Sequence, residues 1–291
     1  MTTPSERQFH TPNSKPGAGV FSSSEDLKTV CKRLRRDIIE MISKAGSGHP
    51  GGSLSAVEIV AALYWKIMRH MPSNPRWPER DRFVLSKGHA APVLYTALAE
   101  CGYFPCSELN TLRQINSHLQ GHTERVTTPG VEISAGSLGQ GLSFAVGTAL
   151  AGQMDKKTWR VYALLSDGEC AEGQVWEAAM AAPNYKLDNL TAIVDKNGIQ
   201  LGGFVKDIMD SDPLNDKFAA FGWHIIDVAD GNNIDQILDA LKKAQTIKGK
   251  PVCIIAHTIK GKGVSFMENN VEFHGKAPNA EQTEKALKEL A

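Results

Sequence analysis

The sequence has no paired-cysteine motif, no net charge and no long hydrophobic run. Its five cysteines form no CxxC pair and leave one unpaired, which argues against a disulfide framework or a zinc site. Lys plus Arg equals Asp plus Glu at 32 each, so neither a nucleic acid nor a membrane is expected as a partner. No apolar stretch reaches the length of a membrane span, and the amino terminus lacks the hydrophobic core of a secretory signal. We therefore expect a soluble, cytoplasmic protein in which Cys31 and Cys253 are buried thiols.

Composition divides the chain of 291 residues into a short tail and one domain. Residues 1–24 are rich in Ser, Pro, Thr and Gly and have little to bury, so we expect a mobile tail. Residues 25–291 contain no internal repeat and no linker, and 42% of the whole chain is hydrophobic, which is enough for one large core.

Predicted strands and helices alternate along this domain. The expected strands are 82–86, 161–165, 190–194, 223–228 and 251–256. The expected helices are 24–44, 54–68, 90–100, 141–154, 172–185, 234–246 and 279–291, with Ser24 and Ser53 as the first two N-caps. This order predicts an α/β fold, a doubly wound and mostly parallel sheet with helices on both faces.

Two polar side chains follow neighbouring predicted strands. Asp167 comes directly after 161–165, and Asn197 comes after 190–194, about one crossover later. Their oxygens would lie side by side at the carboxyl edge of the sheet and would suit a small hard cation, with the carbonyl of Ile199 as a third ligand. The alternative is that Asp167 only caps a helix and Asn197 only forms a turn with Gly198.

Glycine-rich segments carry several histidines. His49 lies in SGHPGG (47–52), His89 in SKGHA (86–90), His122 in GHTE (121–124) and His274 in FHG (273–275). Glycines let a backbone approach a ligand, and imidazoles can bind hydroxyl groups or move protons. Each histidine alone is equally compatible with a hydrogen-bonded loop residue.

Together these motifs resemble the thiamine-diphosphate enzymes, and among them the transketolases. The resemblance rests on the Asp-Gly and Asn motifs, the histidine loops 47–52 and 86–90, and the glycine loop GSLGQG (136–141). It covers 25–274 and only the amino-terminal, diphosphate-binding (PP) half of a full-length transketolase. Thr123 stands where the family has proline, and Ser166 where glycine is more usual.

The resemblance implies a role for each matching residue. The implied metal ligands, for Mg2+ or Ca2+, are Asp167, Asn197 and Ile199. The implied thiamine diphosphate contacts are His89, Gly136, Ser137, Leu138, Gly168, Glu169, Asn197, Leu201 and His274. The implied catalytic residues are His49, His89, His122 and His274, with Glu172 contacting the catalytic glutamate of the partner half.

The resemblance also implies an activity and a partner. Transketolases transfer a two-carbon ketol unit from a ketose phosphate to an aldose phosphate, as in the pentose phosphate pathway. Their essential glutamate and most of the arginines that bind the sugar phosphate belong to the second half, so we expect a split enzyme: this chain with a separate C-terminal subunit carrying the pyrimidine-binding and C-terminal domains, as a heterotetramer. The alternatives are the PP component of a thiamine-diphosphate enzyme that acts on pyruvate or another 2-oxo acid, and a non-catalytic, coenzyme-binding regulatory module.

Overall fold

A five-stranded parallel sheet forms the centre of the chain, in the order β1-β2-β3-β7-β6. The computed structural model describes residues 26–291, so the predicted tail and Ser24 lie outside the described residues. The strands are β1 (Arg82–Leu85), β2 (Val161–Ser166), β3 (Leu190–Lys196), β6 (His224–Val228) and β7 (Val252–His257). All five predicted strands are present, and the predicted α/β fold class is confirmed. A small antiparallel hairpin, β4 (Ile199–Gln200) and β5 (Gly203–Phe204), follows β3.

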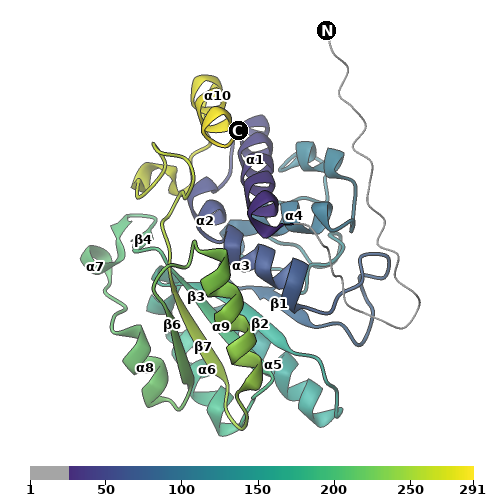
Figure 1. The fold of residues 1–291 in the computed structure, drawn as a ribbon, viewed down its shortest axis with the longest axis vertical. Helices are drawn as coiled ribbons and strands as arrows, with labels where there is room; N and C mark the ends of the chain where they lie inside the picture. Colours follow the sequence, from purple (N-terminus) through teal and green to yellow (C-terminus); the bar gives the residue numbers. More distant parts are fainter. Residues whose placement is uncertain (1–25) are drawn as a thin grey trace.

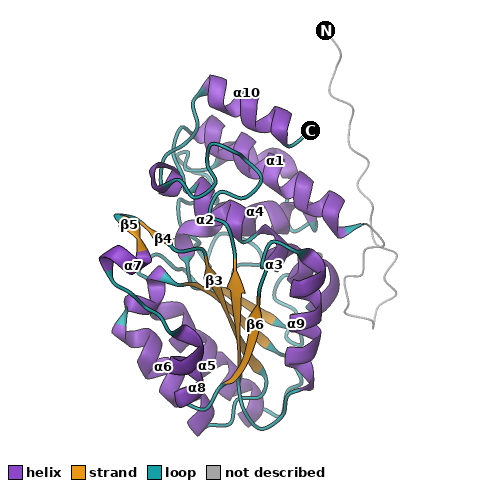
Figure 2. Ribbon diagram, turned by 60° about the vertical axis from the view of Figure 1, so that its left-hand side comes forward, coloured by secondary structure: helices purple, strands orange, loops and turns teal. Residues whose placement is uncertain are grey.

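Helices cover both faces of the sheet. The α-helices are α1 (Leu27–Ala45), α2 (Pro50–Ser55), α3 (Val57–Ala62), α4 (Ala91–Glu100), α5 (Gln140–Met154), α6 (Gly173–Asn184), α7 (Val205–Ile208), α8 (Leu214–Ala220), α9 (Ile234–Thr246) and α10 (Ala280–Glu289). Figure 2 shows α3 and α9 on one side of the sheet and α5, α6 and α8 on the other, with α1, α4 and α10 beyond the strand ends. The first and last helices, α1 and α10, pack together, and Thr283 donates a hydrogen bond to Ser43 between them (Figure 1).

Each strand supplies side chains alternately to two separate cores. In β2, Tyr162 and Leu164 join the core beneath α1, α3, α4 and α9, whereas Val161, Ala163 and Leu165 join the core beneath α5, α6 and α8. Successive side chains of a strand point to opposite faces, so a sheet covered on both sides requires apolar residues at both. This explains why central strands such as β2 and β7 are almost continuous apolar runs.

The predicted helix 54–68 is wrong in its beginning and its continuity. The helical segment begins at Pro50, and Ser53 is a buried residue inside α2 that donates a hydrogen bond to the carbonyl of His49 at 2.8 Å rather than capping a helix. A break at Ala56 separates α2 from α3, and the last turn, Leu63–Ile67, is a π-helix. A proline at the first helical position has the fixed φ that a helix start needs. Pro50 was therefore a signal for the earlier start of this helix.

Two basic side chains of α1 form ion pairs with neighbouring helices. Arg35 is buried and forms a bidentate ion pair with Glu58 at 2.7 and 2.8 Å. Arg33 contacts Glu100 at 2.5 Å. These pairs join α1 to α3 and α4.

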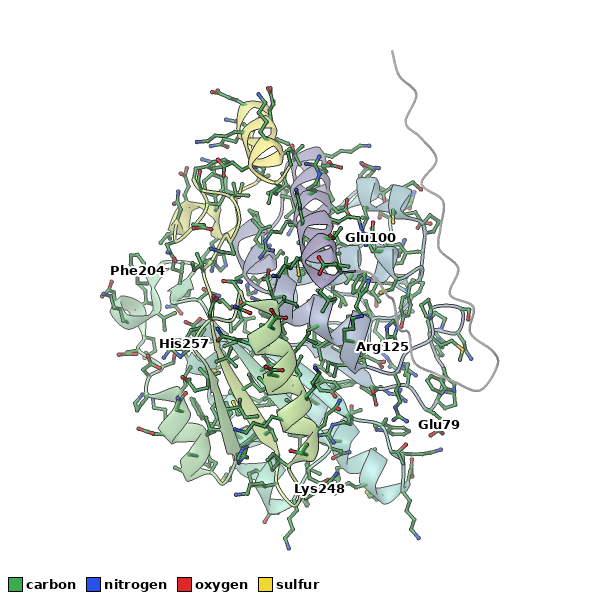
Figure 3. The ribbon with its side chains drawn as sticks, in the orientation of Figure 1. Glu79, Glu100, Arg125, Phe204, Lys248 and His257 are labelled. Carbon is green, nitrogen blue, oxygen red and sulfur yellow. The ribbon has the colours of Figure 1, made fainter. Side chains whose placement is uncertain are left out.

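The carboxyl ends of all five strands point to the same edge of the sheet. Figure 3 labels Lys248 before β7 and His257 at its end, which lie at opposite ends of the sheet. Loops from β1, β2, β3 and β7 therefore meet at one edge, next to α2. In residues 26–291, no helix is both long and apolar enough to cross a membrane.

Candidate active site

The ends of β2 and β3 carry the predicted cation ligands. Ser166 and Asp195 are partners in the parallel register of these strands. Asp167 follows β2, and its carboxylate accepts hydrogen bonds from the backbone N–H of Gly198 at 2.6 Å and of Gly168 at 2.9 Å. The structure therefore brings Asp167 next to the turn after β3. It also makes Asp167 the N-cap of the short 3-10 turn Gly168–Ala171, and not of α6, whose N-cap is Glu172.

Three oxygens of different kinds are available at this edge. Asp167 is only 2% exposed, and Asn197 is also buried. The amide Oδ1 of Asn197 accepts from the N–H of Ile199 at 3.2 Å, and the carbonyl of Ile199 accepts from Lys260 Nζ at 2.7 Å. Residues 26–291 contain no group of three or more His, Cys, Asp or Glu suited to a metal, so a cation here would depend on this mixed set. Carboxylate, amide and carbonyl oxygens are the ligands of Mg2+ and Ca2+.

The charge state of Asp167 supports a cation site. The pKa of its carboxyl is raised to about 6, mainly by burial. The hydrogen bond from Gly198 lowers this pKa, and the neighbouring Asp195 raises it. A buried carboxylate without its hydration shell is stabilised by a positive charge beside it. The residues present therefore fit a divalent cation.

Four histidines from separate loops form one group, which we call the histidine cluster. The ring centroid of His49 lies 5.5 Å from that of His89, 5.7 Å from that of His122 and 5.7 Å from that of His274. The rings of His89 and His274 are 5.3 Å apart and stacked. His49 immediately precedes α2, His89 lies in the 3-10 turn Gly88–Ala90 after β1, and His274 ends the turn Val271–His274. All four predicted histidines are thus neighbours.

Burial and nearby cations keep these imidazoles neutral. Burial, together with Arg113, lowers the pKa of His49 to about 4, and burial together with Lys260 lowers that of His274 to about 3. Burial also lowers the pKa of His89 and of His122. A neutral imidazole has one N–H donor and one acceptor nitrogen, so at neutral pH the cluster can both accept and donate hydrogen bonds.

Lys260 connects the oxygen set to the histidine cluster. Its Nζ donates to the carbonyl of Ile199 and lies 2.8 Å from Nδ1 of His274. The pKa of this amine is lowered to about 7, mainly by burial and also by the charge of Lys87. The carboxylates of Asp195 and Asp167 act in the opposite direction and raise it. The predicted cation ligands and the histidines therefore belong to one site.

The glycine loop lies against this site, held by a buried carboxylate. Gly136 and Ser137 are exposed and Leu138 is half-buried, so the loop is open to a ligand. Gly139 has φ +86°, and a Cβ added there would lie 2.8 Å from Cβ of Glu172. Glycine is therefore required at this position.

Glu169 contributes to the site from inside the protein. Its carboxylate is fully buried and accepts hydrogen bonds from the N–H of Gly139 at 2.9 Å, the N–H of Ser166 at 3.2 Å and the hydroxyl of Ser86. The side chain thus positions the glycine loop and is not itself open to a ligand.

Five of the predicted site residues are exposed, namely His122, Gly136, Ser137, Glu172 and Leu201. Glu172 is exposed as the N-cap of α6 and makes no side-chain capping bond. Leu201, in the β4–β5 turn, is 74% exposed, and Phe204, Ile208 and Met209 are also exposed beside it in sequence. Neither Glu172 nor Leu201 is enclosed by the described residues of this chain.

Three charged residues of the site received no role from the sequence. Lys87 and Asp195 are fully buried and form an ion pair at the ends of β1 and β3. Arg113 donates to Oγ of Ser47 at 2.8 Å and lies 3.4 Å from Nδ1 of His49. A charged residue directly after an apolar strand was an available signal for Lys87 and Asp195, but nothing in the sequence places Arg113 near His49.

Comparison with known proteins agrees with this geometry. Residues 27–291 match the family described as transketolase, thiamine diphosphate binding domain. The 6-deoxy-6-sulfo-D-fructose transketolase subunit SqwG of Clostridium sp. (strain MSTE9) is 47% identical over 265 residues, which is 91% of this chain and 96% of that protein. A subunit of the apulose-4-phosphate transketolase of Actinobacillus succinogenes is 44% identical over 269 residues, 92% of this chain and 97% of that one.

A solved structure gives the same result at the level of the fold. The crystal structure of transketolase from Campylobacter jejuni superposes with a TM-score of 0.86 at 35% identity, covering 91% of this chain and 42% of that one. The predicted family is thereby confirmed. This chain belongs to the transketolase family and corresponds to its thiamine diphosphate binding domain.

Proposed function

We propose that this chain is the N-terminal subunit of a two-subunit transketolase. It would bind thiamine diphosphate and Mg2+ or Ca2+ through a single PP domain, residues 25–291, and transfer a ketol unit together with a C-terminal subunit. Two relatives named as transketolase subunits match nearly end to end, whereas the chain spans less than half of a single-chain transketolase. The observation that carries the proposal is the histidine cluster beside the Asp167, Asn197 and Ile199 oxygens.

The chain's own residues would bind and orient the coenzyme and the substrate, and would exchange protons with the substrate. Thiamine diphosphate, when bound, supplies the nucleophilic carbon and the electron sink for cleaving and forming the carbon–carbon bond. Asp167, Asn197 and the Ile199 carbonyl would hold the metal that anchors the diphosphate. Further contacts would come from His89, His274, Gly168 and the glycine loop 136–139.

The histidine cluster would handle the substrate hydroxyl groups. Neutral His49, His89, His122 and His274 offer donors and acceptors in one place, and their lowered pKa values suit hydrogen bonding without fixed positive charge. Leu201 would meet the coenzyme ring, and Glu172 would meet the C-terminal subunit.

The donor substrate would be a ketose that carries an anionic group. The relatives are named for a sulfo-fructose and for apulose 4-phosphate, which bear a sulfonate and a phosphate. Arg113 places a guanidinium beside His49, where it can pair with such a group. We propose a sugar sulfonate or sugar phosphate as the donor on this basis.

Reconstitution tests the proposal. The chain is assayed together with its co-purifying C-terminal subunit, thiamine diphosphate and Mg2+, using 6-deoxy-6-sulfofructose, a ketose phosphate or pyruvate as the donor and an aldose phosphate as the acceptor. Ketol transfer from either sugar by the pair, with neither chain active alone, is the expected result. Turnover of pyruvate alone would identify a 2-oxo acid enzyme, and coenzyme binding without transfer by the pair would identify a regulatory module. Sizing of the pair tests the expected heterotetramer.

A further inference from the structure

The carboxylate of Asp195 accepts hydrogen bonds from four segments that carry the proposed site. Oδ2 accepts from Ser55 Oγ at 2.6 Å, from Nδ2 of Asn197 at 3.2 Å and from Nζ of Lys87. Oδ1 accepts from the hydroxyl of Thr258. Each donor comes from a different segment: α2, the turn after β3, the loop after β1 and the loop after β7.

Each of these segments also carries a residue of the histidine cluster or of the cation site. The segment of Ser55 begins with His49, Lys87 precedes His89 by two residues, and the loop of Thr258 leads to Lys260 and His274. Lys87 and Ser55 also donate to the carbonyl of Gly52, at 2.9 and 3.2 Å, which closes the network around α2.

The network decides how the amide of Asn197 is oriented. Its Nδ2 must face the carboxylate, because two acceptor oxygens at 3.2 Å would repel each other, and its Oδ1 then faces the N–H of Ile199. The reverse orientation would lose both hydrogen bonds. Asp195 therefore directs the amide oxygen of Asn197 away from itself and toward the backbone N–H of Ile199.

We propose that Asp195 is the positioning residue of the cation site, held by Lys87, and that it fixes the amide oxygen of Asn197 for the metal. This inference rests on the proposed function. Partners of metal ligands commonly contribute about 10- to 100-fold to metal affinity. Asp195 is placed behind the ligands and not among them, because its carboxylate is engaged by the four donors of the surrounding segments, one of them Asn197 itself.

The test removes the buried ion pair without leaving a lone charge. The double variant Lys87→Met, Asp195→Leu replaces both side chains with apolar ones of similar size, a change that buried pairs often tolerate. Binding of Mg2+ with thiamine diphosphate is measured by isothermal titration calorimetry on the full chain, and folding by circular dichroism and thermal unfolding. We expect a folded protein whose affinity for Mg2+ has fallen about 10- to 100-fold.

Two further variants separate positioning from general destabilisation. The double variant Lys87→Met, Asp195→Asn leaves no buried charge of this pair and keeps an oxygen that can accept from Asn197, so its affinity should stay within a few-fold of wild type. The double variant Arg80→Met, Glu132→Leu removes another largely buried ion pair, bonded at 2.7 and 2.8 Å, from segments outside the four loops, and should leave Mg2+ affinity unchanged. If the Lys87→Met, Asp195→Leu variant does not fold, Thr258→Val tests the role of Asp195, because it removes one neutral donor from Oδ1 of Asp195. A several-fold loss of Mg2+ affinity is then expected.

The outcomes are distinguishable. A wild-type chain that binds neither Mg2+ nor thiamine diphosphate, either alone or together with its C-terminal subunit, overturns the proposed function and this inference with it. In the other outcome, the wild-type chain binds both, while the folded Lys87→Met, Asp195→Leu variant or the Thr258→Val variant shows unchanged Mg2+ affinity. This result overturns only the role of Asp195 and leaves the proposed function standing.

Discussion

Nζ of Lys260 lies 2.8 Å from Nδ1 of His274, and both groups have lowered pKa values because they are buried and share one site. The same amine donates to the Ile199 carbonyl. A single lysine thus acts on a proposed substrate-binding imidazole and on a proposed metal ligand.

Replacing Lys260 with methionine should raise the pKa of His274. The positive charge of Lys260 favours the neutral imidazole, so its removal lets the ring protonate at higher pH, while burial still keeps the value below that of a free histidine. Titration of the histidine Cε1–H resonances by NMR measures this. Lys262→Met, which removes a half-buried lysine paired with Glu268 in the same loop, is the matched control and should not shift His274.

Mg2+ affinity should fall as the pH drops below about 6. The folded-state pKa of Asp167 is raised from 3.8 to about 6, so below that pH the folded chain binds a proton that a metal must displace. The affinity should decline by up to about tenfold per pH unit between pH 6 and 4. Calorimetric titrations at each pH provide the measurement.

Asp167→Asn supplies the control for that profile. The variant keeps an oxygen but loses the charge, so it should bind Mg2+ at least about 100-fold more weakly and show little dependence on pH in this window. A wild-type affinity that is constant from pH 8 to 5 would contradict the assignment of Asp167 as a ligand.

Arg113→Met should raise the pKa of His49 and weaken the binding of anionic sugars. Arg113 lies 3.4 Å from His49 and adds to the effect of burial on that ring. In the reconstituted pair, KM for a sulfonated or phosphorylated donor should rise about tenfold or more, with a smaller change in kcat. Arg125→Met is a suitable comparison, because Arg125, labelled in Figure 3, is an exposed arginine of another loop segment. An equal KM in Arg113→Met and wild type would exclude the guanidinium from substrate binding.

Glu169→Gln should destabilise the fold. The buried carboxylate accepts three hydrogen bonds, and an amide in its place turns its NH2 group toward at least one backbone donor. The free energy of unfolding in urea should fall by about 1–3 kcal/mol. Glu177→Gln, at an exposed position of α6, should leave it unchanged. A stability equal to that of wild type would show that the glycine loop does not depend on this carboxylate.

The strand edge of the site was predictable, whereas its interior was not. Asp167 and Asn197 follow apolar strands one crossover apart, and parallel neighbours must end at the same edge, so their proximity follows from the pattern. Ser53 was misassigned because a serine before an apolar helix is a common cap, while Pro50 begins the helix and buries Ser53. Lys87 and Asp195 follow strands too, but their pairing joins residues 108 positions apart.

The sequence by itself determined the sheet, the family and the identity of the histidines and oxygens, because apolar runs and glycine loops are local signals that reflect burial and backbone geometry. Only the tertiary structure decided which polar groups meet. The contacts of Arg113 with His49, of Lys260 with His274 and of Lys87 with Asp195 join loops from different strands. Such contacts depend on strand order and on the depth of each loop, and the burial that results sets the pKa values on which the proposed chemistry depends.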